Sequence, residues 1–372
     1  MKEFAPYYYT IYMFIVMLMT ITRFADLQSL RGYSILFRRE NYWPMIFVSS
    51  FFVLFLGFRP ISMAFVDTVN YNLQYQNLQT LGIGITELPE DYTNDWLFYG
   101  FMALCAQFID VYGFLAIIMC LYVAMMFVGC RKLDSRHGAT LMLFCIGAFS
   151  FYSYAVNGIR NGVACSFVVL AIASVCKGEK IWPIILSFIA INCHKSTALP
   201  LASMFFTYFV RNPKWMYIIW GGALILSLAF GDIIGEIISL IGYDERLASN
   251  IGDATGDEGE VLEKSGFRWD FLIYGIVPMV MGWYVLFVRK VYNNTYLILL
   301  GTYIYANSFW LLVNRTYFSN RYAYLSWFIY PIVLAYPLFN LPVFEKDHSQ
   351  KTAWILLGHL SFTVVMWMLG KQ

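Results

Sequence analysis

The chain is predicted to be an all-α, polytopic integral membrane protein with about twelve transmembrane helices, forming one membrane domain over residues 1–372. Its composition is 60% apolar and only 13% charged, whereas soluble domains are nearer half apolar and a quarter charged. Apolar runs that can cross or nearly cross about 30 Å of hydrocarbon recur along the whole sequence. Aromatic residues make up 19% of the chain, and many flank these runs, as in an interfacial aromatic belt.

The first predicted span has a short flank and no small-residue cleavage site after it, so we expect a membrane helix and not a cleavable signal peptide. The run at 97–109 is short and follows an acidic loop, which indicates an interfacial or re-entrant helix. Two short runs before and after His194 are consistent with two helices, a broken helix or one long tilted helix. The predicted spans are 7–22, 43–58, 111–129, 139–156, 161–177, 181–193, 196–210, 215–241, 271–288, 296–313, 321–339 and 352–369.

The placement of charge predicts the orientation, because cytoplasmic loops are enriched in Lys and Arg. Alternate loops carry the basic residues, and twelve spans then place the N-terminus outside. Two long external loops, 59–95 and 242–270, are mostly acidic. The basic cytoplasmic residues are Arg23, Arg31, Arg38, Arg39, Arg131, Lys132, Arg136, Lys177, Lys180, Arg211, Lys214, Arg289 and Lys290.

A net charge of +2 gives no bulk attraction to nucleic acid, which we do not expect as a partner. The seven cysteines form neither a CxxC motif nor a metal-binding spacing with histidine, and no HExxH motif is present. We therefore predict no metal and no other cofactor.

Arg160 lies in VNGIRNG, between two apolar runs and on the predicted external side. A lipid-headgroup anchor is the simpler interpretation. The alternative is a cation that binds a substrate phosphate, favoured by Asn157, Asn161 and the two glycines, which let backbone approach a ligand. A helix that begins near Asn161 would also point its positive end outward at an anion.

His194, in INCHKSTALP, returns to the same predicted side. A histidine among apolar residues is often a structural hydrogen-bonding group, but imidazole is also suited to act as a general base or phosphate ligand near neutral pH. Lys195 and Ser196 extend the interruption of the apolar hairpin and favour a site. His137 and His348 fall in predicted cytoplasmic loops.

Two further external segments carry candidate residues. After the second predicted span, Asp67 and Tyr71 lie four residues apart, on one face of a helix; Asp67 is either an ordinary exposed acid or an alternative base near Arg59. Late in the chain, Arg315 and Arg321 lie six residues apart at a Tyr-rich external turn, and Tyr324 follows Arg321. Guanidinium groups pair phosphate oxygens in bidentate fashion, so this pair either clamps a diphosphate or consists of tolerated external charges.

The block from Phe151 to Leu201 resembles the core of the EpsG family, the Wzy-like polymerases of exopolysaccharide and O-antigen. That core has an arginine and, after a short span, a Phe-His-x-Ser motif; Arg160 and His194-x-Ser196 match it, with Cys193 in place of Phe and Asn161 in place of a usual Gln. Arg59, Asp67 and Tyr71 resemble the family's Arg…Gly-x-Asp-x-x-x-Tyr without its glycine. Arg321 and Tyr324 resemble its Glu-Arg-x-x-x-Tyr, with Asn320 replacing Glu and with two residues instead of three between Arg and Tyr.

The resemblance implies a metal-independent glycosyltransferase of GT-C type in the bacterial plasma (inner) membrane. Such an enzyme polymerises oligosaccharide repeat units carried on undecaprenyl diphosphate at the external face. Arginines would then stabilise the diphosphate leaving group, and His194 or Asp67 would deprotonate the acceptor hydroxyl. The implied partners are the lipid-linked oligosaccharide, the bilayer, a chain-length regulator and a flippase.

Three alternatives remain. A flippase or transporter of the same lipid-linked sugar would have a similar composition, but charges distributed through the membrane depth. Another lipid-linked-sugar glycosyltransferase, such as an O-antigen ligase, would share the predicted residues. A membrane O-acyltransferase would also need a histidine, but with its signals on the cytoplasmic side.

Overall fold

The computed structural model describes residues 4–240, 266–315 and 319–368, and every regular element among them is a helix. These residues form two compact units: unit 1 comprises residues 1–197 and 335–372, and unit 2 comprises residues 198–334. The all-α prediction is confirmed, whereas the single membrane domain stays a prediction. Most of the predicted external loop 242–270 lies outside the described residues.

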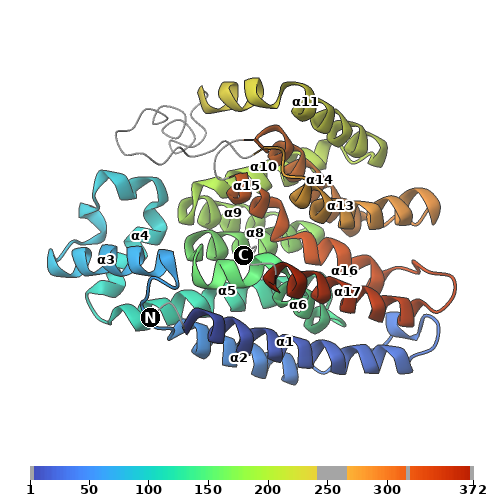
Figure 1. The fold of residues 1–372 in the computed structure, drawn as a ribbon, viewed down its shortest axis with the longest axis horizontal. Helices are drawn as coiled ribbons and strands as arrows, with labels where there is room; N and C mark the ends of the chain where they lie inside the picture. Colours follow the sequence, from blue (N-terminus) through green and yellow to red (C-terminus); the bar gives the residue numbers. More distant parts are fainter. Residues whose placement is uncertain (1–3, 241–265, 316–318, 369–372) are drawn as a thin grey trace. The chain divides into compact units, whose positions relative to one another are not determined.

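Unit 1 is built around two long apolar helices, α5 (Val111–Leu133) and α8 (Ile159–Cys176), which pack side by side (Figure 1). Helix α9 (Ile181–Cys193) packs on the other side of α8, and α2 (Trp43–Gly57) packs on α5. Helix α1 (Phe4–Ser29) lies beside α17 (His348–Met368). Two short helices, α3 (Val66–Thr80) and α4 (Trp96–Ala106), pack on each other near the start of α5.

One predicted span is broken. Helices α6 (Gly138–Ile146) and α7 (Phe149–Val156) replace the run 139–156 and meet at an angle of 74°. A break in an apolar environment exposes backbone carbonyls that must find donors. Buried side chains of α1 and α17 supply them: Tyr12 donates to the carbonyl of Ile146, Thr363 to Gly147 at 2.8 Å, and His359 Nε2 to Phe144 at 2.9 Å.

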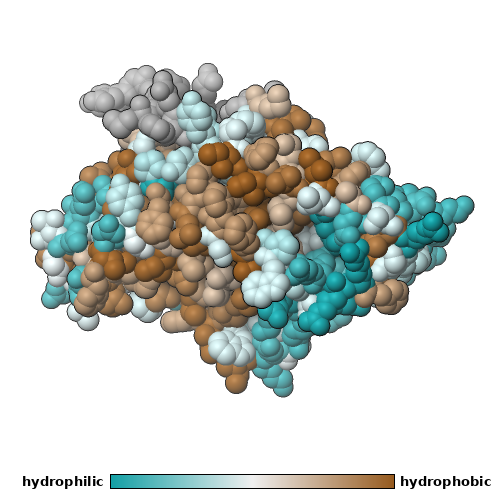
Figure 2. All heavy atoms as spheres, turned by 90° about the horizontal axis from the view of Figure 1, so that it is seen from below, coloured by the Kyte–Doolittle hydropathy of each residue, from teal (hydrophilic) through white to brown (hydrophobic). Residues whose placement is uncertain are grey.

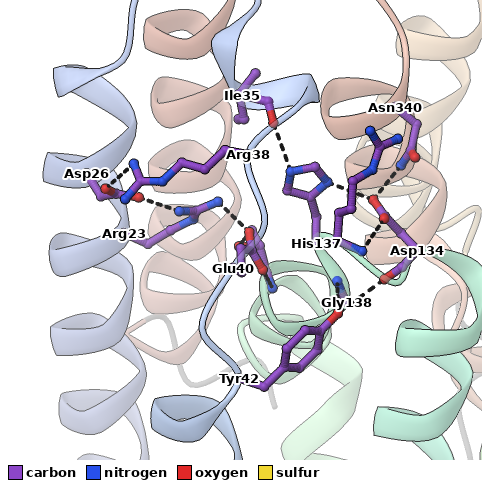
Figure 3. Close-up of polar contacts among 12 residues, drawn as sticks. Arg23, Asp26, Ile35, Arg38, Glu40, Tyr42, Asp134, His137, Gly138 and Asn340 are labelled. Atoms are coloured by element: carbon purple, nitrogen blue, oxygen red, sulfur yellow. Dashed lines mark hydrogen bonds and ion pairs between the residues drawn. The ribbon is translucent and has the colours of Figure 1, made fainter.

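At the end of unit 1 where α5 and α8 terminate, a polar network joins α1, the segment before α2, the turn between α5 and α6, and the last residue of α16 (Tyr330–Asn340) (Figure 3). Arg23 bonds to Asp26 and Glu40, and Asp134 pairs with His137. Asn340 Nδ2 donates to Asp134 at 2.9 Å. This is the end that the basic loops predict to be cytoplasmic.

Unit 2 is centred on α14 (Asn294–Leu312), most of whose residues are buried. Its neighbours are α10 (Ala198–Phe209), α11 (Pro213–Leu240), α13 (Trp269–Trp283), which runs into a π-helical turn at Tyr284–Val288, and α15 (Ser319–Trp327). The close approach of α10 requires Gly301, where a Cβ would lie 2.5 Å from Thr207. Buried Asn307 joins α11 to α15 through Trp220 and Ser326.

The helices agree with the predicted apolar runs, but the number of candidate spans differs from the predicted number. Among the described residues, seven helices are long and apolar enough to cross a membrane, or eight if α6 and α7 are one span. The predicted twelve is therefore not confirmed. One reason is length: α2 has 15 residues and α9 has 13, or about 20 Å at 1.5 Å per residue, which is shorter than the hydrocarbon core.

The surface agrees with a multi-pass membrane protein. Figure 2 shows hydrophobic side chains over much of the face that is drawn, with hydrophilic side chains gathered toward its edges. The predicted interfacial or re-entrant segment 97–109 forms α4, which has 11 residues, followed by a turn into α5. The runs before and after His194 are separate helices, α9 and α10, divided by a 3-10 turn at Lys195–Thr197.

Candidate functional site

The candidate site is organised by one carboxylate, Asp95, at the junction between a 3-10 turn (Glu90–Asp95) and α4. Its side chain makes no capping hydrogen bond to α4. Oδ2 instead accepts hydrogen bonds from Arg160 Nη1 at 2.8 Å and from His194 Nδ1 at 3.0 Å. The structure thus brings Arg160 and His194, 34 positions apart in the sequence, to the same oxygen atom.

The other oxygen of Asp95 fixes the turn after α9. Oδ1 accepts the backbone N–H of Lys195 at 3.0 Å. His194 ends α9 in an extended conformation, with φ −160° and ψ 115°, and its carbonyl accepts the Thr197 hydroxyl at 2.8 Å. The imidazole is therefore held both through its own backbone and through the carboxylate.

Asp95 is buried, with 6% of its surface exposed. Burial alone raises the pKa of this carboxyl, but the hydrogen bond and charge of His194 and the charge of Arg160 outweigh it, so that the pKa lies below its usual value. An ionised carboxylate only accepts hydrogen bonds. His194 therefore donates from Nδ1.

The second ring nitrogen of His194, Nε2, has no hydrogen-bond partner among the described residues, and 22% of the side chain is exposed. With the proton on Nδ1, a neutral imidazole carries its lone pair on Nε2. A carboxylate that holds a histidine in this tautomer is the arrangement by which histidine bases are oriented in acyl-transfer enzymes. This geometry allows His194 to take a proton from a bound hydroxyl.

Aromatic residues enclose Arg160 on the α3 and α4 side. Its Nη1 donates to the Tyr99 hydroxyl at 2.8 Å, and the guanidinium carbon lies 5.2 Å from the Tyr99 ring centroid. Tyr92 stacks on Tyr99 with centroids 4.2 Å apart. The Arg160 charge also acts on the Tyr71 phenol: burial raises the pKa of this group, and the arginine charge opposes the rise. The cation is thus fixed in orientation while 13% of its side chain stays exposed.

Two further contacts lock the end of α9 to the start of α4. Lys195 Nζ donates to Asn94, and Trp96 Nε1 donates to Asn192 Oδ1 at 2.6 Å. The three consecutive residues Asn94, Asp95 and Trp96 therefore each bond to the segment around His194. Arg160 itself lies in the first turn of α8, where a Cβ on Gly162 would come within 2.9 Å of the Tyr154 carbonyl oxygen; this explains one glycine of the NGIRNG motif.

The scan against family models matches the EpsG family over residues 42–371. The chain belongs to the EpsG family. This is a family of polysaccharide polymerase-like membrane proteins, and the predicted resemblance is confirmed. The match covers Asp95 and the residues bonded to it. Neither the search of curated proteins nor the search of solved structures found a match.

The other predicted residues in unit 1 of this EpsG-family chain have contacts of their own. Asp67 and Tyr71 lie on α3, and the charge of Asp67 acts on the Tyr71 phenol. Asn161 Oδ1 accepts a hydrogen bond from Cys165 at 3.2 Å, and Asn157 Oδ1 is buried with no partner among the described residues. Ser196 is half-buried in the turn after His194. Arg59 is fully buried, and its contacts are described below.

Three predicted residues lie in unit 2. Arg315 Nη2 donates to the carbonyl of Leu228 at 3.3 Å. Arg321 is exposed near the start of α15, and the Tyr324 ring lies 5.5 Å from that of Trp327. Their role in substrate binding stays a prediction.

Asp95 was not predicted as a site residue, because in the sequence it is one of five acids in the loop 59–95. The available signal was its position directly before the apolar run of α4, where an acid is close to a helix end. Among the described residues, no group of three or more His, Cys, Asp or Glu side chains could hold a metal ion.

Proposed function

We propose that this chain is a glycosyltransferase that polymerises oligosaccharide repeat units carried on undecaprenyl diphosphate, at the external face of the plasma membrane. The family supports a polysaccharide polymerase-like protein. The observation that carries the chemistry is the shared oxygen of Asp95, which places a candidate base and a candidate anion-binding cation on one carboxylate.

In the proposed reaction, a hydroxyl of the acceptor sugar attacks the anomeric carbon of the donor. The bond between that carbon and the diphosphate oxygen breaks, and the lipid diphosphate leaves. Nε2 of His194 takes the hydroxyl proton, while Asp95 stabilises the imidazolium that forms. Each half of the reaction then has its own group: a base for the nucleophile and a cation for the leaving group.

Arg160 supplies the positive charge for that leaving group. It is partly exposed, and its orientation is fixed by Asp95 and Tyr99 before any ligand arrives. Pre-oriented donors stabilise developing charge without reorganisation during the reaction. Lys195 adds a second cation near His194.

The test is a polymerisation assay with purified protein and authentic lipid-diphosphate-linked repeat units, without nucleotide sugar, metal or acyl donor. We expect a ladder of longer lipid-linked glycans from the wild type, and none from Arg160→Gln at equal folded protein. Arg23→Gln, which removes an ion-paired arginine at the opposite end of unit 1, should keep the ladder. Unchanged repeat units with folded wild type would reject the polymerase and favour transport or acyl transfer.

A further inference from the structure

Arg59 differs from the other candidate arginines in how deeply it is buried. None of its surface is exposed, and among the described residues it has no ion pair with a carboxylate. Instead its guanidinium donates to Thr68 Oγ1 from Nε at 3.2 Å and from Nη2 at 3.0 Å. It also donates to the carbonyls of Leu56 and Val156, each at 2.9 Å.

The two carbonyls explain how the protein tolerates this buried charge. Leu56 is the second-to-last residue of α2, and Val156 is the last residue of α7. The C-terminal end of a helix carries a partial negative charge and unpaired carbonyls. Two such ends therefore face the guanidinium. Burial lowers the pKa of Arg59 to about 10, which still leaves the side chain charged at neutral pH.

Thr68 closes the network. Its hydroxyl accepts from Arg59 and donates to the Val156 carbonyl at 3.1 Å, and its side chain is fully buried. Thr68 lies three residues before Tyr71 on α3, and Val156 lies four residues before Arg160. Arg59 thus links the helix that carries Tyr71 to the turn that leads into Arg160, whose charge acts on the Tyr71 phenol.

We propose that Arg59, acting through Thr68 and Val156, is a positioning residue that holds α3 and the α7–α8 turn together so that Arg160 is correctly placed for the leaving group. The effect on catalysis that this inference predicts rests on the proposed function. A direct contact between Arg59 and a diphosphate, as the sequence suggested, would require the guanidinium to give up four hydrogen bonds to three acceptors inside the protein. The family motif around Arg59 then serves the placement of Arg160.

The experiment uses Thr68→Val, because removing Arg59 itself would leave buried carbonyls unpaired and could unfold the chain. Valine keeps the shape of threonine and removes the hydroxyl; Thr68→Ser restores the hydroxyl. Thr363→Val is the matched control, since the Thr363 hydroxyl also bonds a carbonyl at a helix break of unit 1, that of Gly147. Each protein is studied at full length in detergent.

Hydrogen exchange is measured first. For Thr68→Val we expect exchange of the amides around 156–163 and 66–75 to be about tenfold faster than in the wild type. Thr68→Ser should stay near the wild-type rate, and Thr363→Val should leave both segments unchanged. Equal exchange in Thr68→Val and wild type would overturn the inference.

Kinetics with lipid-linked repeat units are measured second. We expect kcat of Thr68→Val to fall about tenfold with a smaller change in KM, and Thr68→Ser to recover it. Faster exchange with unchanged kcat would overturn the positioning role. A wild type that makes no polymer would reject the proposed function instead, and the exchange data would still decide whether Arg59 and Thr68 hold the two segments.

Discussion

Among the described residues of unit 1, two histidines each pair with an aspartate, and comparing these pairs shows what makes one of them a candidate for catalysis. His194 bonds Asp95 at 3.0 Å near the start of α8, and His137 bonds Asp134 at 2.9 Å at the opposite end of the unit (Figure 3). Helix α8 has 18 residues, so about 27 Å of helix separates the two ends.

The pairs differ in the second ring nitrogen. Nε2 of His137 bonds the carbonyl of Ile35 at 2.8 Å, and the side chain is 1% exposed. Nε2 of His194 has no partner among the described residues, and the side chain is 22% exposed. A histidine with both nitrogens bonded to protein acceptors cannot take a proton from a substrate, so His137 joins helices whereas His194 is available for chemistry.

The largest effect is expected for Asp95→Asn. An amide in place of the carboxylate no longer stabilises the imidazolium or fixes Nδ1 as the donor, so we expect the polymerisation rate to fall about 10²–10⁴-fold. Initial rates of glycan elongation at equal folded protein provide the measurement. A rate within twofold of wild type would show that His194 does not need Asp95 and would remove the distinction between the two pairs.

Asp134→Asn should act on stability and leave the rate nearly unchanged. The Asp134 carboxylate accepts from His137, Asn340 and the Arg136 backbone N–H. Loss of a buried charge that pairs with histidine is expected to lower the free energy of unfolding by about 3 kcal/mol. Thermal unfolding in detergent measures this change. A rate loss as large as that of Asp95→Asn in the folded fraction would contradict a purely structural role.

The stability difference between wild type and Asp134→Asn should itself depend on pH. Burial raises the pKa of Asp134, but the hydrogen bond and charge of His137 outweigh it and hold the pKa below its usual value. A lowered native pKa stabilises the fold above the unfolded pKa of about 4, and this contribution disappears as the pH falls through the native pKa. The difference in the free energy of unfolding between the two proteins should narrow as the pH falls below about 4. Melting curves of both proteins across this pH range test the prediction. A stability difference that widens in acid would contradict a lowered native pKa of Asp134.

Much of the fold could be predicted from the sequence, because apolar runs in a membrane protein must form helices to satisfy their backbone. Each predicted span corresponds to a helix or a helix pair. The boundaries of the helices and the breaks within predicted spans were less predictable. The break between α6 and α7 depends on donors from Tyr12, Thr363 and His359, which come from remote positions in the chain.

The candidate site could be predicted only in part, for a related reason. Arg160 and His194 are conspicuous because each interrupts apolar sequence. Asp95 is one acid among several in a polar loop, and its importance arises from a contact with residues 65 and 99 positions away. Arg59 has the residue type expected of a phosphate ligand, but its burial, which favours a positioning role, appears only in three dimensions.

The smallest effects are expected for Tyr99 and Tyr42, the tyrosines that lie beside the two histidine–aspartate pairs. The Tyr99 hydroxyl accepts from Arg160 at 2.8 Å, whereas the Tyr42 hydroxyl accepts from the Gly138 N–H at 3.2 Å in the other network. Tyr99→Phe should lower the polymerisation rate about fivefold to tenfold, because a typical intramolecular hydrogen bond contributes about 1–1.5 kcal/mol. Tyr42→Phe should leave the rate unchanged and cost about 1 kcal/mol of stability. Parallel rate and melting measurements separate the two effects; equal rates in both variants would mean that Arg160 keeps its orientation through Asp95 alone, without the Tyr99 hydroxyl.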